Sequence, residues 1–348
     1  MTRRREFMAS STVHRGSARA LPEKVGTGFS VGKRSRYWIE SLSCPARRFR
    51  LVGKGSRRAA MISRRNMLIA GAAAAGAALL PRGVSAATGG FASSRLSVVV
   101  RGQGPDVILI PGLTASRDMW SGTVAALPGY RYHLIQLAGF AGDPARGNAS
   151  GPVVTPVAQE IVRYIIANEL KAPTVVGHSM GGLIALMIAA RWPTRIGRTM
   201  VVDMLPAPAA GLGMSVAGLR PLVDGLRDSL TRTPEGRRTL DSLIGMFGPP
   251  DQGARKSDSG LVARAMHDIA VTDLTPELPR ITTPLVVLYA TVPGAQLDMA
   301  AVENAYRSGY AAAKRARLTR IAGSGHMIML DQPQRFRTEL KAFLPAAR

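Results

Sequence analysis

From about residue 90 onward, the chain alternates between short apolar runs and longer stretches with helical spacing. The apolar runs are rich in Val, Ile and Leu and are short enough for buried strands. They cover residues 96–101, 106–111, 131–137, 173–177, 198–203, 284–289 and 317–321. The expected helices cover residues 116–127, 181–192, 299–312 and 332–343. A further helix is expected to start at Thr155 as N-cap, with Pro156 at its first position. Repeated β-α units of this kind predict an α/β fold, with a mostly parallel central sheet covered by helices on both faces.

Residues 204–280 break this alternation. The segment is too long for a connecting loop, and apolar positions at helical spacing recur near 219–230, 237–246 and 261–269. We therefore expect a mainly helical cap insertion over the sheet edge, within a domain that spans residues 87–348. The helical spacing disfavours the alternative, a flexible insertion.

Charge changes the picture at the front of the chain. The 348 residues carry a net charge of +24, which by itself suggests a nucleic-acid binder. However, residues 1–86 hold 18 Lys and Arg against 3 Asp and Glu, whereas residues 87–348 hold 28 against 19. The basic character is concentrated in a leading segment, so we expect no nucleic-acid partner for the domain that follows.

The leading segment ends in the pattern of an export signal. Arg64 and Arg65 precede the apolar run Leu68–Leu80, and Val84-Ser85-Ala86 supplies small residues for a signal peptidase. The run has 13 residues, too few to cross a bilayer. This order predicts a twin-arginine-type signal peptide over 61–86, recognition of the precursor by the twin-arginine export machinery, and a periplasmic or secreted protein without stable membrane insertion. An uncleaved surface helix is the alternative.

Residues 1–60 show no sustained strand or helix period and carry 15 basic and 3 acidic residues. We expect a disordered or mis-assigned upstream extension there, with a basic arm for nucleic acid or anionic lipid as the alternative. The single cysteine, Cys44, lies in this segment, and a single cysteine excludes a disulfide framework or a Cys-rich zinc site. No phosphate-binding or dinucleotide motif occurs, so we expect no cofactor.

The most informative motif is Gly177-His178-Ser179-Met180-Gly181, which stands between a predicted strand and a predicted helix. Gly-x-Ser-x-Gly in this context predicts a nucleophile elbow. The turn strains the serine backbone, and the two glycines remove side chains that would collide. The motif therefore predicts that the Ser179 hydroxyl stands exposed at a helix N-terminus, which favours a developing anion.

A serine nucleophile needs a base, and His326 is the candidate, because it directly follows the last predicted strand. Asp203 and Asp298 are candidates for the acid that orients the imidazole. We favour Asp203, which ends a strand, over Asp298, which stands nine residues after Tyr289 and could instead cap a helix. Asp331 reads as the cap of the closing helix. The backbone N–H groups of Met180 and Leu113 are the expected oxyanion donors.

These motifs give the chain a resemblance. Three motifs are similar to those of α/β-hydrolase-fold serine hydrolases. They are Pro111-Gly112-Leu113 with Trp120, the elbow 177–182, and Gly325-His326 followed by Asp331-Gln332-Pro333. The resemblance runs from about Leu96 to Phe343 and implies esterase or lipase-like chemistry, with the order Ser179, an acid, His326.

The chain also departs from the family pattern. Pro111 stands where the family usually has the histidine of a His-Gly pair, residues 137–141 lack a common acidic residue, and residues 290–294 lack the usual triad acid. Despite these departures, the resemblance leads us to expect an enzyme that hydrolyses carboxylic esters of small to medium, rather apolar substrates. A ligand-binding protein that kept the fold without turnover is the alternative.

Overall fold

A computed structural model describes residues 85–86, 91–208, 216–247, 253–291 and 299–347. Within them, one sheet runs in the order β1-β2-β4-β3-β5-β6-β7-β8. The strands are Ser85–Ala86, Leu96–Arg101, Asp106–Ile110, Arg131–Leu137, Thr174–His178, Arg198–Val202, Leu285–Thr291 and Ala316–Ala322, numbered β1 to β8. β2 is antiparallel to β1 and β4, and all the other neighbours pair in parallel. The prediction of a mostly parallel sheet is confirmed.

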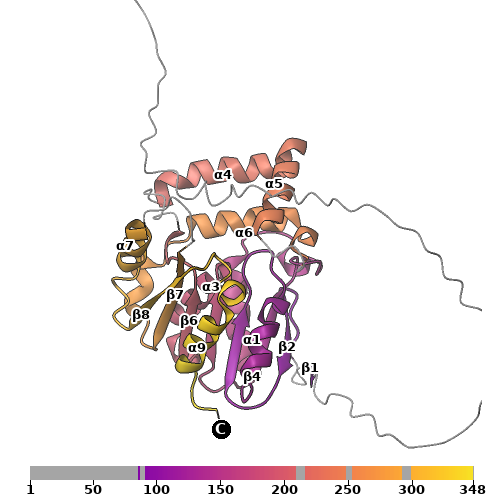
Figure 1. The fold of residues 1–348 in the computed structure, drawn as a ribbon. Coiled ribbons are helices and arrows are strands. Elements are labelled where there is room, and N and C mark those ends of the chain that lie inside the picture. The colour runs from indigo at the N-terminus through magenta and orange to yellow at the C-terminus, as the bar shows by residue number, and fades with distance from the viewer. Residues whose placement is uncertain (1–84, 87–90, 209–215, 248–252, 292–298, 348) are drawn as a thin grey trace, which may run out of the picture. The chain divides into compact units, whose positions relative to one another are not determined.

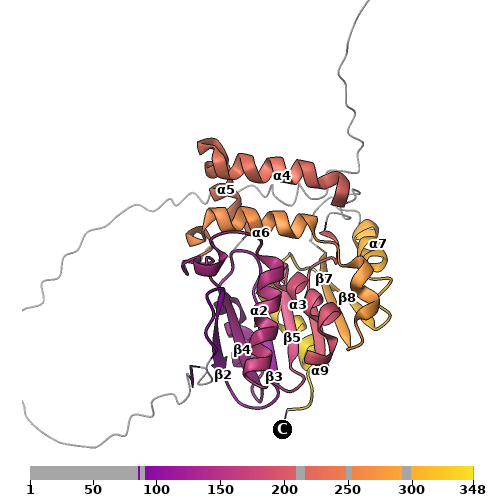
Figure 2. The same cartoon turned by 180° about the vertical axis from the view of Figure 1, so that it is seen from behind.

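Alternate side chains of the strands enter two separate hydrophobic cores. In β3, Ile108 and Ile110 belong to the core under α2 (Val154–Ala167) and α3 (Met180–Arg191). Val107 and Leu109 belong to the core under α1 (Ser121–Ala126) and α9 (Pro333–Phe343). Figure 1 shows α1 and α9 in front of the sheet, and Figure 2 shows α2 on the opposite face. The sheet is thus covered on both faces, as predicted.

α3 explains how the elbow is held. Every residue of this helix except Arg191 is buried, which is expected of a helix that is apolar on all sides. It packs on β5 and β6 and against α2. The residue at its N-terminus therefore has a fixed place above the sheet.

Between β6 and β7, α4 (Val216–Arg232), α5 (Pro234–Phe247) and α6 (Ser259–Val271) stack over one end of the sheet. These helices form the predicted cap, and each is a few residues longer than the sequence pattern indicated. Within the described residues, no helix combines the length and apolar character needed to span a membrane.

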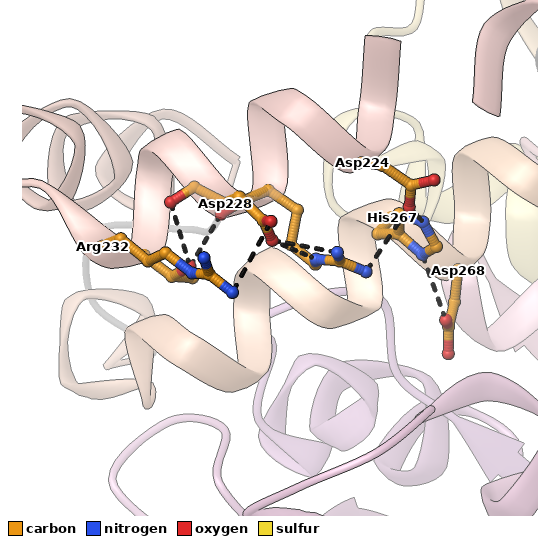
Figure 3. Close-up of polar contacts among 7 residues, drawn as sticks. Asp224, Asp228, Arg232, His267 and Asp268 are labelled. Atoms are coloured by element: carbon orange, nitrogen blue, oxygen red, sulfur yellow. Dashed lines mark hydrogen bonds and ion pairs between the residues drawn. The ribbon is translucent and has the colours of Figure 1, made fainter. Parts of the chain in front are cut away.

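Polar contacts tie the cap together and to the α/β body. In the cap, His267 of α6 pairs with Asp224 of α4 at 2.7 Å, as Figure 3 shows. Beside it, Asp268 accepts hydrogen bonds from the backbone N–H groups of Val153 at 2.6 Å and Val154 at 3.1 Å. A carboxylate from the cap thus satisfies the unpaired donors at the start of α2.

Two predicted helix caps are wrong. Thr155 is not the N-cap of its helix, because α2 begins at Val154 and Asp268 supplies the capping oxygen. Asp331 does not cap the closing helix, because a short helix, α8 (Ile328–Asp331), ends there and Gln332 is the N-cap of α9. In both cases the local residue type suggested a cap, and the folded chain placed the helix boundary elsewhere. α7 (Met299–Gly309) also ends earlier than expected.

Candidate active site

Three loops with strained backbones meet at the carboxyl ends of β3, β5 and β6. Thr114, Ser179 and Asp203 have φ angles of 61°, 52° and 53°, a region that residues other than glycine seldom occupy. Ligands of open α/β sheets bind at this edge. Strain of about 1–3 kcal/mol per residue persists only where the surrounding structure enforces it, which is common at functional sites.

Ser179 occupies the elbow between β5 and α3, and its residue is partly exposed. Its backbone N–H donates to the carbonyl of Val202 in β6 at 2.9 Å, which fixes the turn against the neighbouring strand. A Cβ on Gly177 would lie 2.0 Å from the Gly181 carbonyl oxygen, and one on Gly181 would lie 2.4 Å from that of Ile110. The predicted collision within the turn is confirmed for Gly177, whereas Gly181 is needed because the end of β3 approaches the elbow.

The loop after β3 lies directly against the elbow. A Cβ added to Gly112 would stand 3.3 Å from the Ser179 Cβ and 2.8 Å from His178 Nδ1, so only glycine allows this approach. Leu113 follows in this loop, and its side chain packs against the core. Met180 is the first residue of α3 and is fully buried. The predicted oxyanion donors thus belong to two segments in contact, although their role stays a prediction.

His326 and Asp203 are brought together from 123 positions apart. The His326 Nδ1–H donates to Asp203 Oδ2 at 2.7 Å, and the two side chains are 46% and 14% exposed. This hydrogen bond leaves His326 Nε2 as the nitrogen available for a proton transfer. Asp298, the alternative acid, lies outside the described residues.

His178 holds the loop that carries His326. Its Nε2–H donates to the His326 carbonyl at 2.9 Å, and the two ring centroids are 4.6 Å apart. Burial lowers the pKa of His178 to about 3, with the neighbouring His326 acting in the same direction, so His178 stays neutral. No hydrogen bond joins the described residues Ser179 and His326. Contacts of this kind are often loose in a free enzyme and tighten when substrate binds.

The sequence missed two partners of Asp203. The backbone N–H of Ala290 donates to Asp203 Oδ1 at 2.9 Å, and the Tyr306 hydroxyl donates to the same oxygen at 3.0 Å. Ala290 is the first residue of the segment 290–294, where α/β-hydrolase-fold serine hydrolases usually carry the triad acid. In this chain, the end of β7 supplies a donor to the carboxylate of Asp203, which directly follows β6.

The other histidines of the α/β domain lie elsewhere. His133 of β4 bonds Asp106 at 2.8 Å and Tyr164 at 2.7 Å, and Asp106 is the first residue of β3, at the opposite edge of the sheet from the elbow. His267 lies in the cap, paired with Asp224. These positions agree with the sequence-based preference for His326 as the base.

Comparison with known proteins supports the fold and shows the family. The pattern of the Alpha/beta hydrolase family matches residues 107–339. The pimeloyl-[acyl-carrier protein] methyl ester esterase of Vibrio atlanticus is 26% identical over 214 residues, which are 56% of this chain and 79% of the relative. The corresponding esterase of Aliivibrio salmonicida is 27% identical over 212 residues, or 56% of this chain and 76% of the relative.

Solved structures share the fold at lower identity. A hydrolase from Pseudomonas aeruginosa matches with a TM-score of 0.56 and 19% identity over 72% of this chain and 94% of that one. An esterase from Exiguobacterium antarcticum matches with a TM-score of 0.55 and 21% identity over 71% and 94% of the two chains. Because the family pattern covers most of the chain and the fold agrees, the protein belongs to the Alpha/beta hydrolase family.

Proposed function

We propose that the protein is a serine hydrolase that cleaves a carboxylic ester through an acyl-enzyme. The observation that carries the proposal is the 2.7 Å hydrogen bond between His326 Nδ1 and Asp203 Oδ2, in a loop held by His178 beside Ser179. A histidine oriented by a carboxylate next to a strained elbow serine is the arrangement that activates a hydroxyl nucleophile.

In the proposed reaction, Ser179 Oγ attacks the ester carbonyl carbon while His326 Nε2 takes the hydroxyl proton. The negative oxygen that forms accepts hydrogen bonds from the N–H groups of Met180 and Leu113, each contributing about 3 kcal/mol in the transition state. His326 then protonates the leaving alcohol. Water attacks the acyl-enzyme, with the same imidazole as base, and releases the acid. Asp203 keeps Nδ1 protonated throughout and stabilises the imidazolium.

The comparisons support an ester substrate. The relatives are named as methyl ester esterases, and one structural neighbour is described as an enol-lactonase. We propose that the acid or alcohol group of the ester is small to medium in size and apolar, as expected from the sequence.

The test is turnover of p-nitrophenyl esters of increasing acyl length by the full chain and by Ser179→Ala, together with labelling by a fluorophosphonate probe. We expect turnover and labelling in the wild type and neither in the variant. Equal labelling of both proteins, or binding of the esters without turnover, would contradict the proposal. The second outcome would instead favour a ligand-binding protein on the same fold.

We further propose that the precursor is exported by the twin-arginine machinery and is periplasmic or secreted. The support is the order Arg64-Arg65, the short apolar run and the small residues before Ala87. The test compares the intact mass of the protein produced in a bacterium with that of Arg64→Lys/Arg65→Lys. We expect a mature chain beginning at Ala87 in the wild type and retained precursor in the variant. Retention of residues 1–60 in the exported protein would overturn the proposal.

A further inference from the structure

Tyr306, on the last turn of α7, contributes a buried hydroxyl to the candidate site. Its residue is 7% exposed, and its O–H donates to Asp203 Oδ1 at 3.0 Å. The other oxygen of the same carboxylate accepts from His326. The tyrosine therefore bonds the acid on the side away from the imidazole, from a helix that no site motif includes.

Neighbouring aromatic rings hold Tyr306 in place. Its ring stacks on Tyr289 of β7, with centroids 4.5 Å apart and planes 19° apart. Its ring is also close to that of Tyr310, with centroids 6.4 Å apart and planes 6° apart. Aromatic pairs in such geometry add stability beyond the area they bury. The Tyr306 ring thus has little freedom to carry its hydroxyl away from Asp203.

The chemistry of the group suits a permanent donor. Burial, and to a lesser extent the nearby Asp203 carboxylate, raises the pKa of Tyr306 well above its ordinary value. The hydroxyl therefore keeps its proton at neutral pH. A neutral hydroxyl can accept or donate, but an ionised carboxylate only accepts. The direction of this hydrogen bond is therefore fixed.

We propose that Tyr306 is a positioning residue of the candidate triad: together with the Ala290 N–H, it holds Asp203 so that Oδ2 points to His326. The inference rests on the proposed function. Oδ1 is fully occupied by one backbone and one side-chain donor, and only Oδ2 faces the imidazole. Donation to Oδ1 also draws negative charge away from the oxygen that bonds His326.

The sign of the effect follows from this charge balance. Without the Tyr306 hydroxyl, the carboxylate keeps more negative charge at Oδ2 and stabilises the imidazolium better, so the pKa of His326 rises. The Ala290 N–H remains and limits rotation of the carboxylate. The titratable groups that face this cluster are His178 of the elbow, Tyr289 of β7, Tyr310 after α7, and His326 itself. Glu303 and Arg307 pair with each other along α7.

Tyr306→Phe in the full chain removes the hydroxyl and keeps the ring. Tyr310→Phe is the matched control, because its buried hydroxyl donates to the Met204 carbonyl at 2.7 Å and not to Asp203. For each variant, kcat and KM with p-nitrophenyl butyrate are measured across pH. The pKa of His326 is measured separately by NMR titration of its imidazole protons, assigned with His326→Gln. Thermal unfolding shows whether each variant is folded.

For Tyr306→Phe we expect kcat to fall several-fold with KM unchanged, and the acid limb of the pH profile and the NMR pKa of His326 to rise by about half a unit. Tyr310→Phe should lose a similar amount of thermal stability, but it should change neither the acid limb of the pH profile nor the NMR pKa of His326. An unmoved or lowered His326 pKa in Tyr306→Phe, or an equal shift in Tyr310→Phe, would overturn the inference. Because the NMR titration needs no substrate, a protein without esterase activity would defeat only the proposed function.

Discussion

His326 and His267 each bond an aspartate at 2.7 Å, the first at the carboxyl edge of the sheet and the second between two cap helices. Asp203 has a side chain that is 14% exposed, and two further donors occupy its second oxygen. Asp224 is 43% exposed and also faces Arg227 at 3.5 Å. The same contact distance thus belongs to two different environments.

The difference shows that a short His–Asp distance does not by itself indicate a catalytic pair. At the sheet edge, partial burial and complete hydrogen bonding hold the carboxylate in one orientation, and a strained serine is nearby. In the cap, His267 also lies 3.6 Å from Asp268, on the side opposite to Asp224 along the cap helices (Figure 3). The other oxygen of Asp268 caps α2. That histidine links α4 and α6 where the cap meets the body, which is a structural role.

The largest difference between the two pairs is expected on removal of their histidines, with Ser179→Ala measured alongside. We expect Ser179→Ala and His326→Ala each to lower kcat by about 10⁴-fold or more, because the nucleophile and its base act as one unit. His267→Ala should change kcat by less than about threefold, since no reacting group is near it. Rates of p-nitrophenyl ester hydrolysis at equal concentrations of folded protein measure all three. A His267→Ala variant as inactive as His326→Ala, yet folded, would contradict the contrast.

The next largest difference is expected between the two aspartates, Asp203 and Asp224. Asp203→Asn should lower kcat by about 10³- to 10⁴-fold, because an amide cannot stabilise the imidazolium and favours the wrong tautomer. Asp224→Asn is the matched change in the cap and should leave kcat nearly unchanged. Asp298→Asn is measured in the same series. If it proved the inactive variant and Asp203→Asn stayed active, Asp298 would be the acid and Asp203 a structural carboxylate.

A third pair, His133 with Asp106, extends the comparison to stability. Burial pushes the pKa of Asp106 upward, but hydrogen bonds from His133 and Arg131 outweigh it and lower that pKa from 3.8 to about 2. Because the pKa is lower in the folded state, the stabilisation is complete above about pH 4 and is lost as the pH falls toward 2.

Asp106→Asn should therefore reduce the free energy of unfolding by about 2 kcal/mol at pH 7, with kcat unchanged. Urea denaturation between pH 7 and pH 3 measures the gap between variant and wild type, which should be constant near neutrality and narrow below about pH 4. A gap that grew on acidification would show that the pair does not stabilise the fold in this way.

The smallest effect is expected where the cap meets α2. Asp268→Ala leaves the N–H groups of Val153 and Val154 without their carboxylate, which should cost about 1 kcal/mol. Hydrogen exchange should increase in the first turn of α2, and KM should rise more than kcat falls, because the cap is held less firmly. Asp273→Ala, at an exposed turn, is the control. Equal exchange in both variants would remove Asp268 from this role.

The sequence alone was sufficient for the sheet and for the position of the elbow between a strand and a helix, and it indicated His326 as the candidate base. Seven strands follow from short apolar runs, because a strand buried on both faces must be apolar along its length. Gly177 avoids a backbone collision with Gly181, only four residues away, so this part of the motif has a local cause, whereas Gly181 avoids the carbonyl of Ile110 at the end of β3. His326 could be chosen because the carboxyl ends of parallel strands share one edge.

Only the tertiary structure decided how Asp203, the candidate acid, is held. Asp203, Ala290 and Tyr306 are separated by up to 103 positions, and no local pattern links them. For the same reason, the donors at the start of α2 find their acceptor in Asp268, 115 positions away, while Thr155 offered a plausible cap nearby. Periodicity and tight turns are local and can be read from neighbours in the chain. The partner that satisfies a buried polar group is chosen by packing, which brings distant segments together.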